Sequence, residues 1–140
     1  MKKLVLGLLS LTLIATACKK SKDSTPITKE TITGTYKMTA AKLTVSGVPG
    51  SHDAFADMSD CQKDDLYKLN ADYTFDYVDA GTICNPAGDF SDVWSLSGNQ
   101  LTLYGTTGTI TKFDGSILEV TVTTTDQGTT YTSTTTFQKQ

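Results

Sequence analysis

The stretch "DLYKLNADYTFDYVD", residues 65–79, holds two short runs in which apolar and polar residues alternate. Tyr73, Phe75 and Tyr77 recur at every second position, which places three aromatic side chains on one face of a strand. Residues 70–72, Asn-Ala-Asp, lie between the runs and are typical of a tight turn. The stretch therefore predicts a β-hairpin with one buried face.

The same alternation continues along the chain on both sides of this hairpin. With the hairpin included, strands are expected at residues 33–47, 65–71, 73–79, 92–98, 100–105, 107–113, 116–125 and 129–138. Threonine, which favours strands over helices, is abundant in these segments. In the first segment the alternation slips by one position near Ala40, which predicts a β-bulge at that point.

Most of the connections between these segments are short, and successive hairpins of this kind form a meander. Strands that close on themselves leave no exposed sheet edge. We therefore expect an all-β fold, an eight-stranded antiparallel up-and-down barrel over residues 31–138, with a two-sheet sandwich as the alternative. A barrel of this size holds either packed side chains or one small ligand.

The first 30 residues predict an export signal and a tether. Lys2 and Lys3 precede an apolar run at residues 4–14, which has the length of a signal peptide and is too short to span a bilayer. Small residues and then Cys18 follow, so residues 1–17 are expected to be removed. Residues 18–30 are expected to form a flexible tether, because they are polar and hold no aromatic residue.

Cys18 follows the predicted cleavage point directly and is the expected site of acylation by diacylglycerol and palmitate. Several acyl chains together give stable membrane anchoring. An ordinary signal peptide, with Cys18 left as a free thiol, is the alternative. Cys61 and Cys84 lie in two longer connections, residues 47–63 and 80–90, which leave the hairpin at the same end. We expect them to form a disulfide, because an exported protein is oxidised, and we expect a short helix at about residues 54–58.

The pattern as a whole resembles the lipocalin-like lipoproteins of Bacteroidetes-type bacteria. The resemblance rests on the lipobox-like N-terminus, "ITGTYKMTA", "CQKDDLYKLNADYTFDY", the second cysteine after a short gap, and "VWSLSGNQLTL". Ala15 stands where lipoboxes usually have leucine, and Tyr36 stands where tryptophan is commoner. The resemblance implies a lipocalin-like barrel in a cell-envelope protein anchored in the outer membrane, on its periplasmic or its surface side. It implies no particular ligand.

Charge and composition argue against several functions. The formal charge is −3, arginine is absent and no basic cluster occurs past residue 22, so we expect no nucleic-acid binding. His52 is the single histidine, and its neighbours Ser51 and Asp53 are too close in sequence to form a catalytic triad with it. We therefore expect no enzyme activity and no cofactor.

Acidic residues are dense near the first long connection. Asp53, Asp57, Asp60, Asp64 and Asp65 are expected to surround one barrel mouth as a solvated rim. A calcium site is the alternative for these carboxylates, although they lack the D-x-D-x-D-G spacing. We expect no metal.

Two functions remain open. In the first, the barrel binds a small apolar or amphipathic ligand, and the inward aromatic residues line its site; these are Tyr36, Tyr73, Phe75, Tyr77, Trp94 and Tyr131. In the second, these side chains form a packed core and the protein serves as a structural or protein-interaction component of the envelope, with a partner that the sequence does not identify. A cavity of roughly 300 Å³ or more inside the barrel would favour ligand binding.

Overall fold

A computed structural model describes residues 25–140, so the predicted signal peptide and Cys18 lie outside the described residues. The elements are α1 (Lys29–Ile32), β1 (Gly34–Val45), β2 (His52–Asp53), α2 (Asp60–Lys63), β3 (Leu66–Leu69), β4 (Thr74–Val78), β5 (Phe90–Ser97), β6 (Gln100–Leu103), β7 (Thr106–Phe113), β8 (Ile117–Asp126) and β9 (Thr129–Lys139). Among these residues, no helix has the length and hydrophobicity that a bilayer-spanning helix needs.

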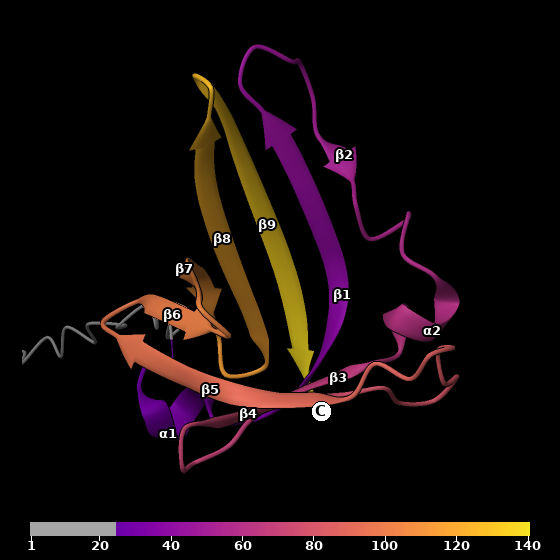
Figure 1. Ribbon diagram of the computed structural model, residues 1–140. Coiled ribbons are helices and arrows are strands. Elements are labelled where there is room, and N and C mark those ends of the chain that lie inside the picture. Colours follow the sequence, from indigo (N-terminus) through magenta and orange to yellow (C-terminus); the bar gives the residue numbers. More distant parts are fainter. Residues whose placement is uncertain (1–24) are drawn as a thin grey trace, which may run out of the picture.

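The strands form a closed antiparallel barrel. From β3 to β9 each strand pairs with the next one in sequence, and β1 closes the barrel by pairing with both β3 and β9 (Figure 1). The predicted eight-stranded meander is therefore confirmed. The short β2 was not expected as a strand. It pairs with β1 only at Lys42 and Leu43, on the edge that β1 exposes where it runs past β3.

The predicted bulge in the first strand is also confirmed. The register of β1 against β9 shifts between Met38 and Ala40, so that Met38 pairs with Phe137 and Ala41 pairs with Thr135. Because one extra residue turns every later side chain over, Leu43 and Val45 continue the inner face that Tyr36 begins. A second shift, between Ile110 and Lys112 of β7, has no counterpart in the sequence prediction.

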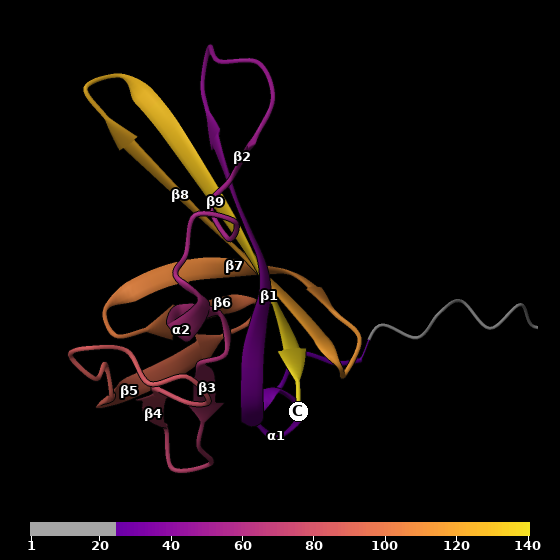
Figure 2. The same ribbon diagram turned by 90° about the vertical axis from the view of Figure 1, so that its right-hand side faces the viewer.

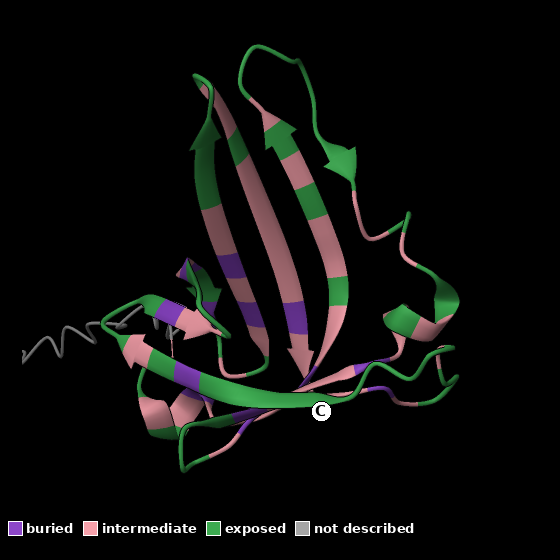
Figure 3. Ribbon diagram, in the orientation of Figure 1, coloured by how far each residue is buried: buried purple, intermediate pink, exposed green. Residues whose placement is uncertain are grey.

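Three strands extend well beyond the rest of the barrel. The ends of β8, β9 and β1 form a sheet that rises above β5, β6 and β7 (Figures 1 and 2). We call this part the projecting sheet. On its outer face threonine hydroxyls meet across β8 and β9, as in the pair Thr123–Thr132 at 3.3 Å. Buried residues lie only in the lower part of these strands (Figure 3).

Large side chains fill the lower part of the barrel. The buried apolar residues are Ile32, Tyr36, Leu69, Phe75, Trp94, Leu101, Ile110, Phe113, Leu118, Val120 and Phe137. The helix α1 closes this end, because Ile32 is fully buried and the Tyr36 hydroxyl donates to the Ile32 carbonyl over 2.7 Å. The Lys139 ammonium group also donates to the Thr31 carbonyl at 2.9 Å. We call this the closed end.

Two boundaries differ from the sequence prediction. The folded part begins before residue 31, since α1 starts at Lys29 and Ile27 packs against the core. The predicted tether therefore overlaps a segment that is ordered by apolar contacts. The helix expected at about residues 54–58 is wrong, because α2 lies at Asp60–Lys63. There the Ser59 and Gln62 side chains form a capping box, the local signal that fixes the start of a helix.

Candidate functional site

The end of the barrel opposite α1 is open, and we call it the mouth. Five connections surround it: residues 46–51, residues 54–65, residues 79–89, and the turns at 104–105 and 127–128. The two cysteine-bearing connections thus lie at the same end of the barrel, as expected. Five of the exposed large hydrophobic side chains also lie here: Val48, Ile83, Phe90, Tyr104 and Tyr131.

Between the mouth and the core lies an apolar cleft of about 110 Å³. Its lining comes from β6, β7, β8 and β9, and consists of Leu101, Leu103, Tyr104, Thr106, Gly108, Val120, Val122, Thr135 and Phe137. Gly108 keeps the cleft open, because a Cβ at this position would lie 2.5 Å from Cγ1 of Val120. Deeper in the barrel the free space is only about 10 Å³, room for no more than one water molecule.

The barrel interior is therefore filled, and the large enclosed cavity that would have favoured ligand binding is not present in the described part. The cleft is well below the roughly 300 Å³ of an ordinary ligand pocket. Three of the six predicted lining residues, Tyr36, Phe75 and Trp94, are buried core residues with exposed fractions of 2% or less. The Trp94 indole donates to the Asn70 carbonyl at 2.9 Å, which places this ring toward the closed end rather than beneath the mouth.

Two other predicted lining residues lie outside the interior. Tyr73 is not part of β4; its φ of 69° turns its side chain out of the alternation, and the Lys29 ammonium group lies 4.2 Å from its ring centroid. The sequence prediction missed this because Tyr73 completes the period-two pattern while its backbone belongs to the turn. Tyr131 lies on the inner face of the projecting sheet, beyond the barrel, and is 38% exposed.

Tyr77, the remaining predicted residue, belongs to an aromatic cluster that leads from the core to the mouth. The cluster consists of Tyr67, Phe75, Tyr77, Phe90, Tyr104 and Phe137. Ring centroids are 5.2 Å apart for Tyr77 and Phe90, and 5.7 Å for Phe90 and Tyr104. Burial raises the pKa of Tyr67 and, together with a hydrogen bond to Asp65, that of Tyr77, so both rings stay uncharged.

Tyr104 is the member of the cluster that the sequence prediction missed. It is half exposed and borders the cleft, and its φ of 34° lies in the left-handed region. Tyr104 and Gly105 form the turn between β6 and β7. The glycine after Tyr104 was a local signal for this turn. The alternation of residues 100–105 does not reveal, however, that the Tyr104 ring stacks on Phe75.

A second, more open hollow lies on the inner face of the projecting sheet. It is lined by Leu43, Val45, Val48, Pro49, Gly50, Ser51 and His52. Register places Leu43 opposite Ser133 and Val45 opposite Tyr131 on β9, so these side chains share the face that lower down carries Phe137 and Thr135. The apolar surface therefore continues from the cleft onto the projecting sheet.

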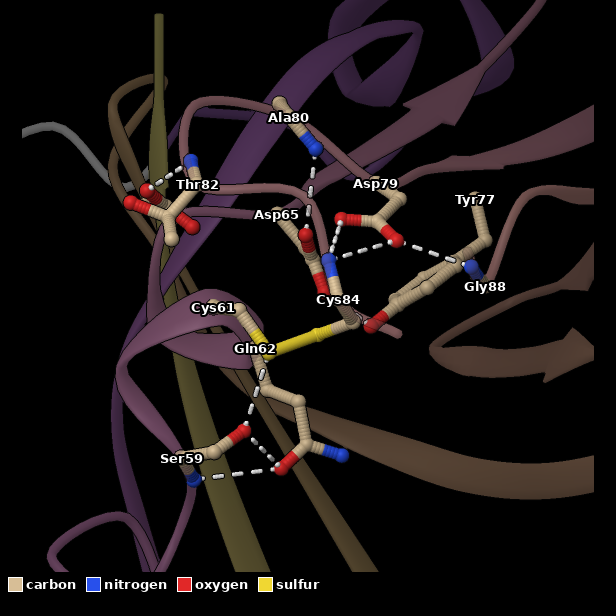
Figure 4. The surroundings of a disulfide bond; sticks show 11 residues. Ser59, Cys61, Gln62, Asp65, Tyr77, Asp79, Ala80, Thr82, Cys84 and Gly88 are labelled. Carbon is tan, nitrogen blue, oxygen red and sulfur yellow. Dashed lines mark hydrogen bonds between the residues drawn. A yellow bond between two sulfur atoms is a disulfide. The ribbon is translucent and has the colours of Figure 1, made fainter. Parts of the chain in front are cut away.

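One side of the mouth is held by a disulfide and by buried carboxylates (Figure 4). The predicted disulfide between Cys61 and Cys84 is confirmed and ties α2 to the loop at residues 79–89. Asp79, which is 5% exposed, accepts hydrogen bonds from the backbone N–H groups of Cys84 at 3.1 Å and Gly88 at 2.8 Å. Asp65, 1% exposed, accepts from the Tyr77 hydroxyl and from the Ala80 N–H.

The acidic residues are therefore only partly the solvated rim that was expected. Asp65 is buried and acts as a structural acceptor, and Asp64 accepts from the Thr82 N–H at 2.9 Å. Within residues 25–140, no group of three or more metal-ligating side chains has the geometry to hold an ion, so the calcium alternative has no support from the described part. His52 contacts Asp57, with Nε2 and Oδ2 2.5 Å apart, and both side chains are exposed.

A family model described as "Lipocalin-like domain" matches residues 32–126, which is more than half of the sequence. The chain belongs to the lipocalin-like domain family. The match runs from the end of α1 to the end of β8, so β9, which closes the lipocalin-like barrel, lies after it. No curated protein and no solved structure matches the chain at a significant level.

Proposed function

We propose that this lipocalin-like protein is a lipid-anchored component of the bacterial cell envelope that binds the apolar part of a small amphipathic ligand at its mouth. The observation that carries the proposal is the cleft beside Tyr104, an opening from solvent onto apolar side chains. The match to the lipocalin-like family supports a binding role, because barrels of this size accommodate small ligands.

The size of the cleft defines what enters it. A cavity of about 150 Å³ holds one benzene ring, so about 110 Å³ accepts the end of an alkyl chain or the edge of a small ring. The remainder of the ligand would lie along the inner face of the projecting sheet, over Leu43 and Val45. The ligand is thus held at the surface rather than enclosed.

Anchoring through acylated Cys18 is the second half of the proposal. It is supported by the sequence around Cys18 and by the pairing of Cys61 with Cys84, which leaves Cys18 as the cysteine available for a lipid. Wild-type protein expressed in a Gram-negative host should fractionate with the outer membrane and incorporate labelled palmitate. Cys18→Ser should do neither, and recovery of wild type in the soluble periplasm would refute the anchor.

No enzyme activity, cofactor, metal or nucleic acid enters the proposed function. The exposure of the single histidine supports this, since the His52 and Asp57 side chains contact each other in solvent and neither is held in a buried site. The filled interior supports a second candidate function, in which the protein contacts an envelope protein through the mouth and carries no small ligand.

Methyl NMR distinguishes the two candidates. The full chain carrying Cys18→Ser, which has no acyl group of its own, is titrated with dodecyl maltoside below its micelle concentration. Binding at the cleft should shift the methyl signals of Val120 and Val122 and leave those of Leu69, near the closed end, unchanged. A response that is absent or uniform over all methyl groups would leave the interaction protein as the better explanation.

A cleft-filling variant provides the matched control. Thr135→Phe places a ring in the cleft and should abolish saturable binding. Thr134→Phe makes the same change one residue away on the outer face of β9, where Thr134 contacts Thr121, and should bind as wild type does. Equal binding by the two variants would refute the location of the site.

A further inference from the structure

The hydroxyl groups of β8 and β9 are paired on the outer face of these strands and unpaired on the inner face. On the outer face they meet across the two strands at oxygen–oxygen distances of 3.1–3.3 Å, in the pairs Thr121–Thr134, Thr123–Thr132 and Thr125–Thr130. On the inner face the register places each hydroxyl opposite an apolar or aromatic side chain, in the pairs Val120–Thr135, Val122–Ser133 and Thr124–Tyr131. The inner hydroxyls therefore have no equivalent partner across the strands.

The neighbours of the inner hydroxyls on β1 are apolar as well. Ala41 pairs with Thr135, and Leu43 pairs with Ser133. Two residues along a strand span about 6.8 Å, so Thr135 and Ser133 are too far apart to bond to each other. Within residues 25–140, the hydroxyls of Thr135, Ser133 and Thr124 form no hydrogen bond with another protein group. We call these three residues the hydroxyl row.

The hydroxyl row begins in the cleft and continues onto the projecting sheet. Thr135 lines the cleft together with Val120, its partner on β8. Ser133 and Thr124 follow toward the tips of β9 and β8, where these strands rise above the barrel (Figure 1). Sites for small molecules combine apolar walls with a few polar groups that fix the orientation of the ligand. A ligand whose apolar end fills the cleft would bring its next atoms against the hydroxyl row.

The described residues place no charged side chain within the hydroxyl row. The lining of the cleft holds none, and Lys42 lies on the outer face, where its partner on β9 is Thr134. Asp126, at the tip of β8 beyond Thr124, is the first charged residue along the inner face of this strand. Burying a charge without a partner is costly, whereas a neutral polar group needs only a hydrogen bond. The hydroxyl row therefore favours an uncharged polar group.

We propose that the ligand of the mouth is an amphiphile with an uncharged head group that forms hydrogen bonds, such as a sugar or an amide. Its apolar end enters the cleft, and its head group bonds to Thr135, Ser133 and Thr124. A hydroxyl both donates and accepts, so the row can bind the hydroxyls of a sugar or the carbonyl and N–H of an amide. The inference rests on the proposed function, because it names the chemical class of that ligand.

The stability of the fold does not require the inner hydroxyls. Valine resembles threonine in shape and also favours strands. At residue 135 it would add an apolar contact to Val120, and no protein hydrogen bond would be lost. Thr135→Val should therefore leave the free energy of unfolding unchanged or raise it, which makes this variant suitable for a binding test.

Three probes with the same short alkyl chain test the inference. Hexyl glucoside, hexyltrimethylammonium and hexyl sulfate are each titrated into the full chain carrying Cys18→Ser, below their micelle concentrations, and binding is followed by methyl NMR. A short chain brings the head group close to Thr135. We expect the glucoside to bind most tightly, because the trimethylammonium group forms no hydrogen bond of this kind and the sulfate has no cation to pair with.

Variants that remove one hydroxyl locate the effect. Thr135→Val and Ser133→Ala should each lower the ratio of the affinities for the glucoside and the trimethylammonium probe roughly two- to tenfold, as expected for one lost hydrogen bond. Thr134→Val removes a hydroxyl from the outer face of β9 and is the matched control. It should leave the ratio unchanged, and urea unfolding shows separately whether each variant is folded.

The outcomes separate the inference from the proposed function. If none of the three probes binds, the proposed function itself is wrong. Equal binding of all three, or preference for a charged probe, would overturn the inference and leave the mouth site in place. Preference for the glucoside that survives both Thr135→Val and Ser133→Ala would show that the head group is recognised elsewhere, and the role assigned to the hydroxyl row would then be wrong.

Discussion

Asp79 should hold the 79–89 loop in place, and replacing it by alanine should lower stability more than any change to an exposed carboxylate at the mouth. The carboxylate is 5% exposed and accepts hydrogen bonds from the Cys84 and Gly88 N–H groups (Figure 4). No lysine or histidine in the described part of the chain lies within ion-pair distance of it. Its role is thus to satisfy backbone donors.

The magnitude follows from the donors that would be left without an acceptor. A hydrogen bond to a charged group contributes about 1.5–3 kcal/mol, and an unsatisfied buried donor costs about 1–3 kcal/mol. The loop is only partly buried, so water replaces part of what is lost at two N–H groups. We expect Asp79→Ala to lower the free energy of unfolding by about 2–4 kcal/mol. Asp60→Ala, at a side chain that is 98% exposed, should cost less than about 0.5 kcal/mol.

Urea unfolding with the disulfide intact measures the stability, and amide hydrogen exchange locates the change. In Asp79→Ala the amides of Cys84 and Gly88 should exchange much faster, while those of β8 keep their protection relative to global unfolding. A loss below about 1 kcal/mol with unchanged exchange at Cys84 and Gly88 would refute the role assigned to Asp79. It would mean that the disulfide alone fixes the loop.

Two further predictions concern the disulfide and the closed end. Cys61→Ser with Cys84→Ser removes a disulfide that joins residues 23 apart in sequence. The free energy of unfolding in urea should fall by about 2–4 kcal/mol, with no change in the circular dichroism spectrum. Two reactive thiols at these positions in the wild-type protein would contradict this prediction. Tyr36→Phe should cost about 1 kcal/mol at neutral pH, because the Ile32 carbonyl loses its donor. Burial raises the pKa of Tyr36 to about 12, above the value near 10 of an unfolded tyrosine. The uncharged ring therefore stabilises the fold below pH 10, and this contribution is lost as the pH rises toward 12. The difference between wild type and Tyr36→Phe should narrow over that range in pH-dependent urea unfolding, and a constant difference would contradict the assignment.

Local patterns predicted most of the strands and the disulfide, because these follow from short-range rules. Alternation of apolar and polar residues, as in 73–79, shows which face of a strand is buried. A slip in this alternation near Ala40 predicted a bulge, and the register shift between Met38 and Ala40 confirms it. Cys61 and Cys84 pair because two strands of one hairpin place their connections at the same end. The acylation of Cys18 stays a prediction, since that residue lies outside the described part.

The lining of the candidate site could not be read from alternation in the same way. Alternation assigns a side chain to a face, but it does not say how far along the barrel that face stays covered. Tyr36 and Tyr131 both lie on the inner face of their strands, yet the first is buried beneath α1 and the second is exposed on the projecting sheet. Whether an inner-face side chain is buried therefore depends on whether the strands on the opposite side of the barrel extend as far as that side chain.

The sequence by itself determined the class of fold, the order of the strands and the pairing of the cysteines. Each strand of such a barrel has one buried face, so apolar residues recur at every second position and can be recognised in the sequence. Only the tertiary structure decided that the interior is filled and that the opening lies beside Tyr104. The volume left between packed side chains depends on how all the strands converge. At Gly108, for example, an added Cβ would lie only 2.5 Å from Cγ1 of Val120.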